Sequence, residues 1–358
     1  MQEKDPMELD FRMQRMLEAA IHAPSGDNCQ PWRFQVEHGS KVSVYTVAER
    51  AHSFFDFGER GTLLSVGAVL ENMRIQAASD GLATDVIYND GERKDGLQAV
   101  VRLRSDPEVF IAPSMVKAML RRTVNRRPFL PVKVAQKKLL AMCADPVEGV
   151  EISIIDRRRH IRQWARLIYL ADRIRYSHPV IHEELFSKIL FSKEMANKKR
   201  MGLEIDRLGA GPAAKSIMSF LQPWERMKRL QKYGIDKLLA NQSRSLGLAS
   251  GALVLVSVKE NTRREWIRAG MQMERLWVAA EEQGLCVHPM TVVLFLIQRF
   301  REEGVTSFLP EHCTLLEEMD AELKKMTGDG TATMLFRVGT GLRMKGTAVR
   351  LPLESFLD

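Results

Sequence analysis

The chain has 358 residues, of which 45% are hydrophobic and 27% charged, so it can bury the cores of two ordinary domains or of one larger body, and disorder is not expected. It has no run of about 18 apolar residues, and its start, MQEKDPMELD, carries acids where a signal peptide would have a basic and then an apolar stretch. These features exclude a secreted or membrane-spanning class and predict a cytoplasmic protein without a membrane partner.

The net charge of +8 could serve a nucleic acid, an anionic membrane surface or a phosphorylated small ligand. Basic residues cluster at 121–129, 156–162, 197–200 and 261–268, with no Gly/Arg repeat and no basic strand with interleaved aromatic residues. For the last three clusters we expect solvated helix faces and short loops, and no nucleic-acid partner. The four cysteines form no C-x-x-C pair, which predicts free thiols and no metal site.

Near the N-terminus, an amphipathic pattern predicts a helix that begins at about residue 11. It breaks at the turn formers of residues 23–28, and an aromatic-containing strand follows at Trp32 and Phe34. Such a loop presents hydroxyl, amide and backbone groups together, which suits a planar heterocycle rich in carbonyls and ring nitrogens. A plain surface turn explains it equally well.

An internal repeat organises the rest of the chain. The segments GAVLENMRIQAASDGLA, from Gly67, and GMQMERLWVAAEEQGLC, from Gly270, align without a gap. The identical pairs are Gly67/Gly270, Glu71/Glu274, Ala77/Ala280, Gly81/Gly284 and Leu82/Leu285. Each segment predicts a mostly buried helix ended by a glycine, and each follows a β-rich stretch, at 41–47 and 252–258. Two unrelated amphipathic helices are the alternative explanation.

We therefore expect two unequal halves, 1–115 and 116–358, the second with a helical insertion at about 158–245. The insertion contains the helical stretches 162–176 and 218–243, with a Gly-containing break at 208–214 between them. The run 192–202 is either a lid or an exposed helix, and Gly209 and Gly211 are hinge candidates.

At the start of the second half stands RRTVNR, residues 121–126. Guanidinium groups pair bidentately with phosphate oxygens, and a threonine hydroxyl adds a donor, so this segment fits a phosphate monoester. A solvated basic linker between the halves is the alternative.

Together these motifs resemble the nitroreductase-like FMN oxidoreductases. The segment A-P-S-x-x-N-x-Q-P-W-R-F is intact from Ala23 to Phe34, and residues 121–126 resemble R-R-[ST]-x-R with one residue inserted before Arg126. The C-terminal FRVGTG (336–341) and RLPLESF (350–356) resemble the closing strand and basic tail of that family. The resemblance covers most of the chain except about 158–235.

The order of the motifs departs from the family, in which the arginine motif precedes A-P-S-x-x-N within one half. Here the first half carries only A-P-S-x-x-N and the second half carries only the arginine motif. Where the second half would have A-P-S-x-x-N, it reads CADPVEGVEISII. The pattern resembles the tandem, Acg-type members. It implies an α+β nitroreductase fold, duplicated as a pseudo-dimer whose central mixed or antiparallel sheets are flanked by helices, with one surviving FMN site under a lid. The chain would then be monomeric or a weak homo-oligomer.

The resemblance also implies roles for single residues. The FMN phosphate would be held by Arg121, Arg122, Thr123 and Arg350, and less certainly by Asn125 and Arg126. The flavin ring or ribityl chain would contact Pro24, Ser25, Asn28, Gln242, Arg244 and the stretch Pro289, Met290 and Thr291, where backbone N–H groups would face flavin N5.

The function so implied is FMN-dependent, ping-pong hydride transfer from NAD(P)H to a small electron-poor acceptor such as a nitroaromatic or quinone. No catalytic side chain is required; the backbone near Met290 and Thr291 would assist. The chain has no G-x-G-x-x-G after a strand, so NAD(P)H would be a transient substrate. The alternative is an FMN-sequestering protein with a closed lid and little reductase activity. His288 is a weaker candidate proton donor, Cys286 is expected to be packed, and Trp32 and Trp277 are expected in the core.

Overall fold

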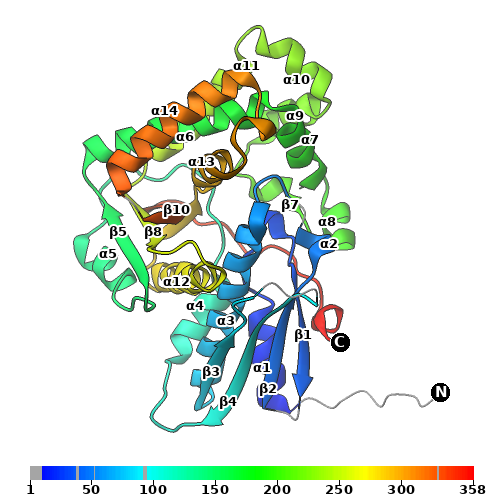
Figure 1. Cartoon of the computed structure of the whole chain (residues 1–358), viewed down its shortest axis with the longest axis vertical. Helices are drawn as coiled ribbons and strands as arrows, with labels where there is room; N and C mark the ends of the chain where they lie inside the picture. The colour runs from blue at the N-terminus through cyan, green and yellow to red at the C-terminus, as the bar shows by residue number, and fades with distance from the viewer. Residues whose placement is uncertain (1–9, 38–39, 52, 92–94, 329) are drawn as a thin grey trace, which may run out of the picture.

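The protein is an α+β structure in which helices cover two four-stranded antiparallel sheets (Figure 1). The computed structural model describes residues 10–37, 40–51, 53–91, 95–328 and 330–358. The predicted class, antiparallel sheets flanked by helices, is confirmed. None of the helices in these ranges is long and apolar enough to cross a bilayer.

The two sheets have the same strand order. The first contains β1 (Trp32–Glu37), β2 (Lys41–Thr46), β3 (Leu82–Tyr88) and β4 (Leu97–Ser105), in the order β1-β2-β4-β3. The second contains β5 (Val150–Ile155), β8 (Ala252–Val258), β9 (Cys286–Pro289) and β10 (Thr331–Gly339), in the order β5-β8-β10-β9. In each, a long buried helix follows the second strand, as an internal repeat would require.

These two long helices, α3 (Arg60–Ser79) and α12 (Arg263–Glu282), pack against each other at the matched glycines. A Cβ on Gly67 would lie 2.0 Å from the Ile267 carbonyl oxygen, and one on Gly270 would lie 2.2 Å from that of Leu64. Leu64 and Ile267 are themselves aligned in the repeat, so the contact is reciprocal, as across a two-fold axis. The glycines that follow the helices, Gly81 and Gly284, both have φ of 72°, which suits a helix end.

Because the backbones touch at this crossing, we expect Gly67→Ala to destabilise the fold by about 1–3 kcal/mol or more. The added methyl group would have to displace the Ile267 carbonyl and the Gly270 Cα, which it would approach to 2.7 Å. Urea unfolding measures the effect. Gly26→Ala is the matched control because no atom lies within 4 Å of its added Cβ; equal stability of the two variants would contradict the tight crossing.

The remaining helices of the two halves cover the sheets. They are α1 (Phe11–Ala20), α2 (Ala48–Ala51), α4 (Pro113–Arg121), α5 (Gln136–Met142), α13 (Val292–Glu303) and α14 (Pro310–Thr327). The buried core is continuous across both sheets, and Trp32 and Trp277 lie in it as expected. The predicted boundary between residues 115 and 116 falls inside α4, so the exact division of the halves stays a prediction.

The predicted insertion corresponds to six helices along the top and the right side of the molecule in Figure 1. They are α6 (Arg158–Ser177), α7 (Pro179–Lys188), α8 (Lys193–Lys199), α9 (Pro212–Leu221), α10 (Trp224–Gln231) and α11 (Ile235–Leu248), with short strands β6 (Ile189–Leu190) and β7 (Leu203–Glu204) between α7 and α9. The predicted helical stretch 218–243 is not continuous. It is divided at Pro223, which precedes α10, and at Gly234, whose φ of 80° interrupts a helix.

The C-terminal tail after β10 crosses from the second sheet to the first. Leu357 forms a parallel bridge to Phe34, and the Phe356 ring stacks on Trp32 with centroids 6.0 Å apart. The tail thereby carries Arg350 past the loop between α1 and β1. The two predicted motifs and the basic tail consequently meet at one place.

Candidate functional site

The loop at residues 23–30 has an unusual backbone. Asp27, Asn28 and Gln30 have φ values of 49°, 57° and 51°, a region that non-glycine residues occupy at a cost in free energy. The Ser25 hydroxyl accepts from the Gln30 N–H at 2.9 Å, and the Asn28 amide donates to Val349 O at 3.0 Å. Such strain persists only when the surroundings hold it, and it is common at ligand sites.

This loop forms one wall of a cavity of about 90 Å³. The opposite walls come from the segment after α4, from residues 202–207 of the insertion and from residues 347–350 of the tail. The predicted site residues that line it are Pro24, Ser25, Asn28, Arg122, Thr123, Arg126 and Arg350. Both predicted motifs and the basic tail therefore face the same space, as the complementary halves required.

Three guanidinium groups converge on the cavity from three separate segments: Arg126, Arg207 and Arg350. Burial lowers the pKa of Arg126 to about 10, that of Arg350 to about 9, and that of Arg207 by a smaller amount. Repulsion between like charges lowers these pKa values further: Arg175 and Arg207 act on Arg126, and Arg122 and Arg207 act on Arg350. A depressed arginine pKa means that the positive charge lacks adequate compensation, so the cavity favours an anion.

Hydrogen bonds hold Arg350 in place without neutralising it. Its guanidinium donates to the Asn28 side-chain oxygen and to Ala23 O, while its buried Nε has no partner among the described residues. Acidic groups near the cavity are Asp27 and Glu204, and Glu204 already accepts from the Val349 N–H at 3.1 Å.

Arg122 is arranged differently, because its charge has a buried counter-ion. Its Nε lies 2.7 Å from the Glu274 carboxylate, its Nη2 donates to His22 O at 2.6 Å, and its guanidinium stacks over Trp277. Burial raises the pKa of Glu274 to about 7, and Arg122 opposes that rise. Arg122 therefore anchors the loop wall to α12 and is less available to a ligand than the other three arginines.

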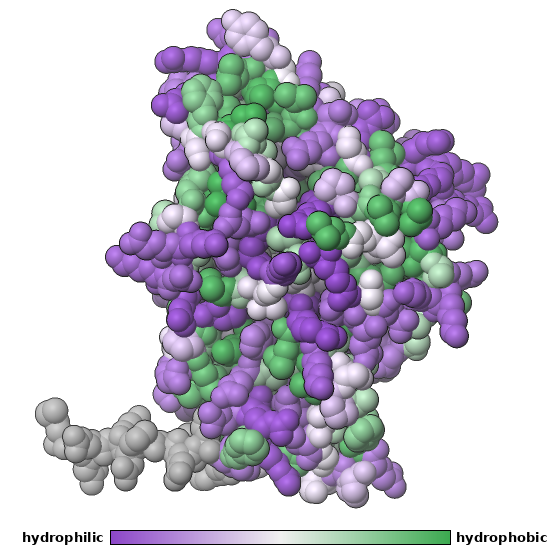
Figure 2. Space-filling view, turned by 180° about the vertical axis from the view of Figure 1, so that it is seen from behind, coloured by the Kyte–Doolittle hydropathy of each residue, from purple (hydrophilic) through white to green (hydrophobic). Residues whose placement is uncertain are grey.

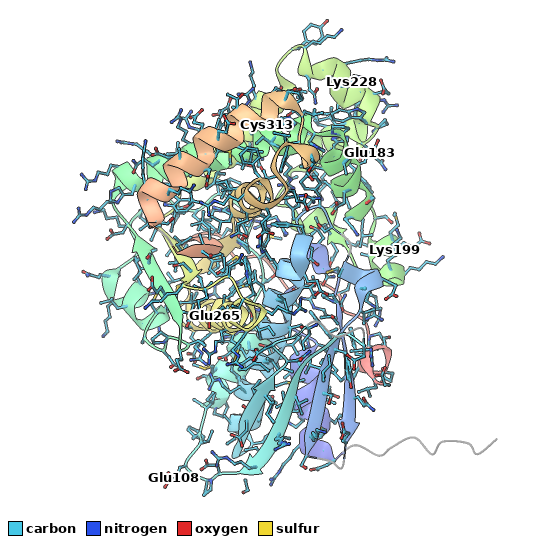
Figure 3. All side chains as sticks on the ribbon, viewed as in Figure 1. Glu108, Glu183, Lys199, Lys228, Glu265 and Cys313 are labelled. Carbon is cyan, nitrogen blue, oxygen red and sulfur yellow. The ribbon has the colours of Figure 1, made fainter. Side chains whose placement is uncertain are left out.

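Residues 200–207, named here the strap, cross the cavity between α8 and α9; Lys199, at the end of α8, marks its start in Figure 3. The Arg207 guanidinium donates to Thr123 Oγ1 and to Gly346 O, each at 2.6 Å. At the other end, Arg200 O accepts from the Gln30 side chain at 2.7 Å. The strap thus bonds to the first half and to the tail across the cavity.

A second cavity, of about 350 Å³, adjoins the first and shares Leu120, Thr123 and Thr347 with it. Arg121 lines only this second cavity and lies 3.8 Å from the Glu281 carboxylate. Cys286 also lines it, and burial raises the pKa of its thiol, which fits the expected packed cysteine.

Five predicted residues do not line either cavity. Gln242 and Arg244 lie exposed on α11, because that helix turns Ala240 and Gly247 inward. Pro289, Met290 and Thr291 lie at the end of β9 and the start of α13, and the Met290 N–H already donates to Leu335 O at 2.7 Å. Next to them, His288 Nδ1 accepts from Arg337, and burial with nearby Arg337 and Arg126 lowers its pKa well below the usual value.

The sequence motifs indicated no role for five polar residues that line the cavity: His22, Asp27, Glu204, Arg207 and Thr347. Burial, with Arg350 and Arg122 nearby, lowers the pKa of His22 to about 4, so its ring is neutral at pH 7. His22 directly precedes the segment that runs from Ala23 to Phe34, so its place in the sequence could have indicated it. Arg207 carried no sequence signal, because only the folding of the insertion brings it to Thr123.

No protein-family model matches the chain. It is 28% identical over 326 residues to the Mycobacterium tuberculosis "Uncharacterized protein MT1398", covering 90% of this chain and 44% of that protein. It is also 31% identical over 114 residues to "Uncharacterized protein Rv3127" of the same species, covering 31% of this chain and 33% of that protein. The chain therefore spans less than half the length of these relatives.

Among solved structures, the chain resembles the FMN-dependent nitroreductase NfnB from Mycobacterium smegmatis in complex with NADPH, with 13% identity, 68% of this chain and 96% of that chain covered, and a TM-score of 0.36. It also resembles iodotyrosine deiodinase bound to FMN and 3-iodo-L-tyrosine, with 12% identity, 66% and 95% coverage, and a TM-score of 0.37.

Proposed function

We propose that this chain binds one FMN and acts as an FMN-dependent oxidoreductase that takes a hydride from NAD(P)H and passes it to a small electron-poor acceptor. The observation that supports this best is the convergence of Arg126, Arg207 and Arg350 on a cavity closed by the strained loop. Guanidinium groups with Thr123 suit a phosphate monoester, which carries nearly two negative charges at pH 7.

The donor set fits the phosphate end of FMN. The buried, unpartnered Nε of Arg350 and the hydroxyl of Thr123 are groups that a phosphate oxygen could engage. The cavity volume of about 90 Å³ is enough for such a group, but lies below the roughly 300 Å³ of small-molecule sites. The rest of the cofactor would extend beyond this cavity, either into the adjoining cavity of about 350 Å³ or past the strap.

Once bound, FMN would supply the two-electron chemistry. The chain would hold its phosphate through Arg126, Arg207 and Arg350, and would orient the remainder through Pro24, Ser25 and Asn28. The backbone at Thr291 stays the proposed donor near the reactive ring. The strap, when closed, would exclude water from the cavity.

A second candidate function, FMN sequestration, is favoured by one specific observation. The strap bonds to Gln30, Thr123 and Gly346 on both sides of the cavity. If it stays closed, it keeps a nicotinamide from stacking on the flavin. Both candidates require bound FMN, and they differ in whether NAD(P)H can reach it.

One FMN per chain is expected, because each half keeps only one of the two motifs, residues 23–34 in the first half and residues 121–126 in the second. The first half has a counterpart of the Arg122–Glu274 pair on α3. There, Glu71, the counterpart of Glu274, pairs with Arg74 at 2.7 Å and with Arg275 at 3.0 Å, and Arg275 also pairs with Asp145 at 3.0 Å. These arginines lack the unbalanced charge that an anion would need. They tie α3 to α12 instead.

The absorbance spectrum of the purified protein and the flavin released from it test this proposal. Flavin bands with a flavin-to-protein ratio near one are expected. A ratio near two would show that the second half retains a working site. Absence of flavin, with none taken up from added FMN, would rule out both candidate functions.

A further inference from the structure

The insertion presents an amphipathic surface at one end of the molecule, remote from the cavity. In α9, Ala213, Ile217 and Phe220 are spaced at i, i+4 and i+7, so they share one exposed face. Tyr233, in the turn between α10 and α11, is 86% exposed, and Leu238 in the first turn of α11 is 66% exposed. Figure 2 shows apolar side chains gathered over the end of the molecule formed by α9 and α10.

Cations surround these apolar side chains. Residues 212–238 contain six lysines and arginines against two acids. Five of the six are exposed, and Lys228 projects from α10 at this end in Figure 3. They are Arg226, Lys228, Arg229, Lys232 and Lys237. Together with Ile217, Phe220, Tyr233 and Leu238 they are named here the insertion surface.

The charges of the insertion surface are not balanced internally. Within the described parts of the chain, none of these five cations forms an ion pair, whereas Arg166, Arg264 and Arg301 elsewhere each pair with a carboxylate. Of the two acids, Asp236 is buried and lies 3.9 Å from Arg173. The surface is thus complementary to an extended negative charge.

We propose that the insertion surface docks this protein on an anionic phospholipid bilayer. Exposed apolar side chains beside a basic face are typical of structures that lie in the headgroup region, and lysine stems can place their charges in water while the apolar tips insert. Protein interfaces are depleted of lysine, and single-stranded nucleic acid is held by stacked aromatic platforms. A small group of exposed apolar side chains with three exposed lysines around it fits a fluid lipid surface better than either.

This proposal departs from the sequence-based expectation of no membrane partner, which considered the basic clusters only one by one. None of the four sequence clusters lies in residues 212–238, where the cations are spaced among apolar residues. Folding of α9, α10 and the start of α11 brings them to one end of the molecule (Figure 1). Docking here leaves the FMN cavity uncovered, so it is independent of the proposed function.

Co-sedimentation of the full chain with vesicles tests the proposal. We expect binding to vesicles of phosphatidylglycerol and phosphatidylcholine at low salt, little binding to pure phosphatidylcholine, and release at high salt, because surface charges are screened. Each cation near an anionic surface changes affinity about fivefold. The triple variant Lys228→Gln/Arg229→Gln/Lys232→Gln should therefore bind at least tenfold more weakly.

Two further variants separate docking from general attraction. Ile217→Ser/Phe220→Ser should weaken binding while the salt dependence persists. Lys133→Gln/Lys137→Gln/Lys259→Gln removes the same charge from exposed positions elsewhere and should bind like the unchanged protein. Circular dichroism checks that every variant is folded.

Several outcomes would overturn the proposal. Equal binding to both kinds of vesicle, or no binding to either, would remove the anionic bilayer as the partner. An equal loss in the control triple variant would reduce the effect to net charge. If Ile217→Ser/Phe220→Ser instead converts a dimer to a monomer in solution, the surface is an interface between two copies of the chain.

Discussion

Arg350→Gln should weaken FMN binding by about ten- to a hundredfold. Its guanidinium lines the cavity, has a buried Nε without a partner among the described residues, and has a pKa lowered to about 9 by burial and by Arg122. A charge-assisted hydrogen bond is worth about 1.5–3 kcal/mol. Titration of the cofactor-free protein with FMN, followed by flavin fluorescence, measures the change.

The stability of the cofactor-free protein distinguishes ligand binding from a structural role. Arg350→Gln removes the bonds to Asn28 and Ala23 but also removes a desolvated charge near Arg122. These effects oppose each other, so the unfolding midpoint without FMN should change little, and the stabilisation that FMN adds should fall. Arg157→Gln, at an exposed arginine outside the cavity, is the control. An equal FMN affinity in both variants would contradict the phosphate assignment.

Local patterns were enough to predict much of this architecture. The matched glycines of α3 and α12 are visible in the sequence because two backbones can approach closely only where side chains are missing. The turn formers predict the loop at residues 23–30. The motifs of the two halves complement each other, which predicts that this loop faces the same cavity as Arg122, Thr123 and Arg350. These features depend on residues close together in sequence or on whole motifs.

The residues whose surroundings differ from the expectation, and those that no motif indicated, depend on tertiary packing. Arg122 was assigned to the phosphate from its motif, but Glu274 of α12 compensates its charge, and no local pattern reveals that partner. The resemblance implies flavin contacts for Gln242 and Arg244, yet α11 continues to Leu248 and turns both side chains outward. Arg207 lies more than 80 positions from Thr123 and reaches it only through the fold of the insertion.

The two candidate functions use the same FMN site. They differ in how fast NAD(P)H can reach the flavin past the strap. The strap is eight residues long, it follows the short helix α8, and Gly202 within it and Gly209 just after it both have positive φ. Its contacts to Gln30, Thr123 and Gly346 are a few hydrogen bonds at the surface of the cavity. Strand β7 within the strap also pairs with β6, and Ile205 is buried, so opening has to break these contacts or move β6 together with the strap. An opening strap would admit both the cofactor and a nicotinamide.

Replacing strap residues 200–207 with glycine and serine, at unchanged length, should therefore speed reduction of the bound FMN by NAD(P)H at least tenfold. Reduction by dithionite, a small reductant that needs no stacking, should keep its rate. Stopped-flow absorbance at saturating FMN, which offsets the lost contact of Arg207, measures both. The double variant Met195→Ser/Lys198→Ser changes exposed residues of α8 alone and serves as the matched control. Faster reduction by NAD(P)H in this variant would identify α8, and not the strap, as the lid.

The unchanged protein decides between the two candidate functions in the same experiment. We expect NAD(P)H to reduce its FMN, more slowly than in the strap variant, and a quinone or nitroaromatic to restore the oxidised spectrum. Reduction by dithionite alone, with NAD(P)H reactivity appearing only after the strap is replaced, would identify a sequestering protein. NAD(P)H inactive on both proteins would refute nicotinamide-dependent chemistry, because the variant removes the one segment whose bonds to Gln30, Thr123 and Gly346 close the cavity.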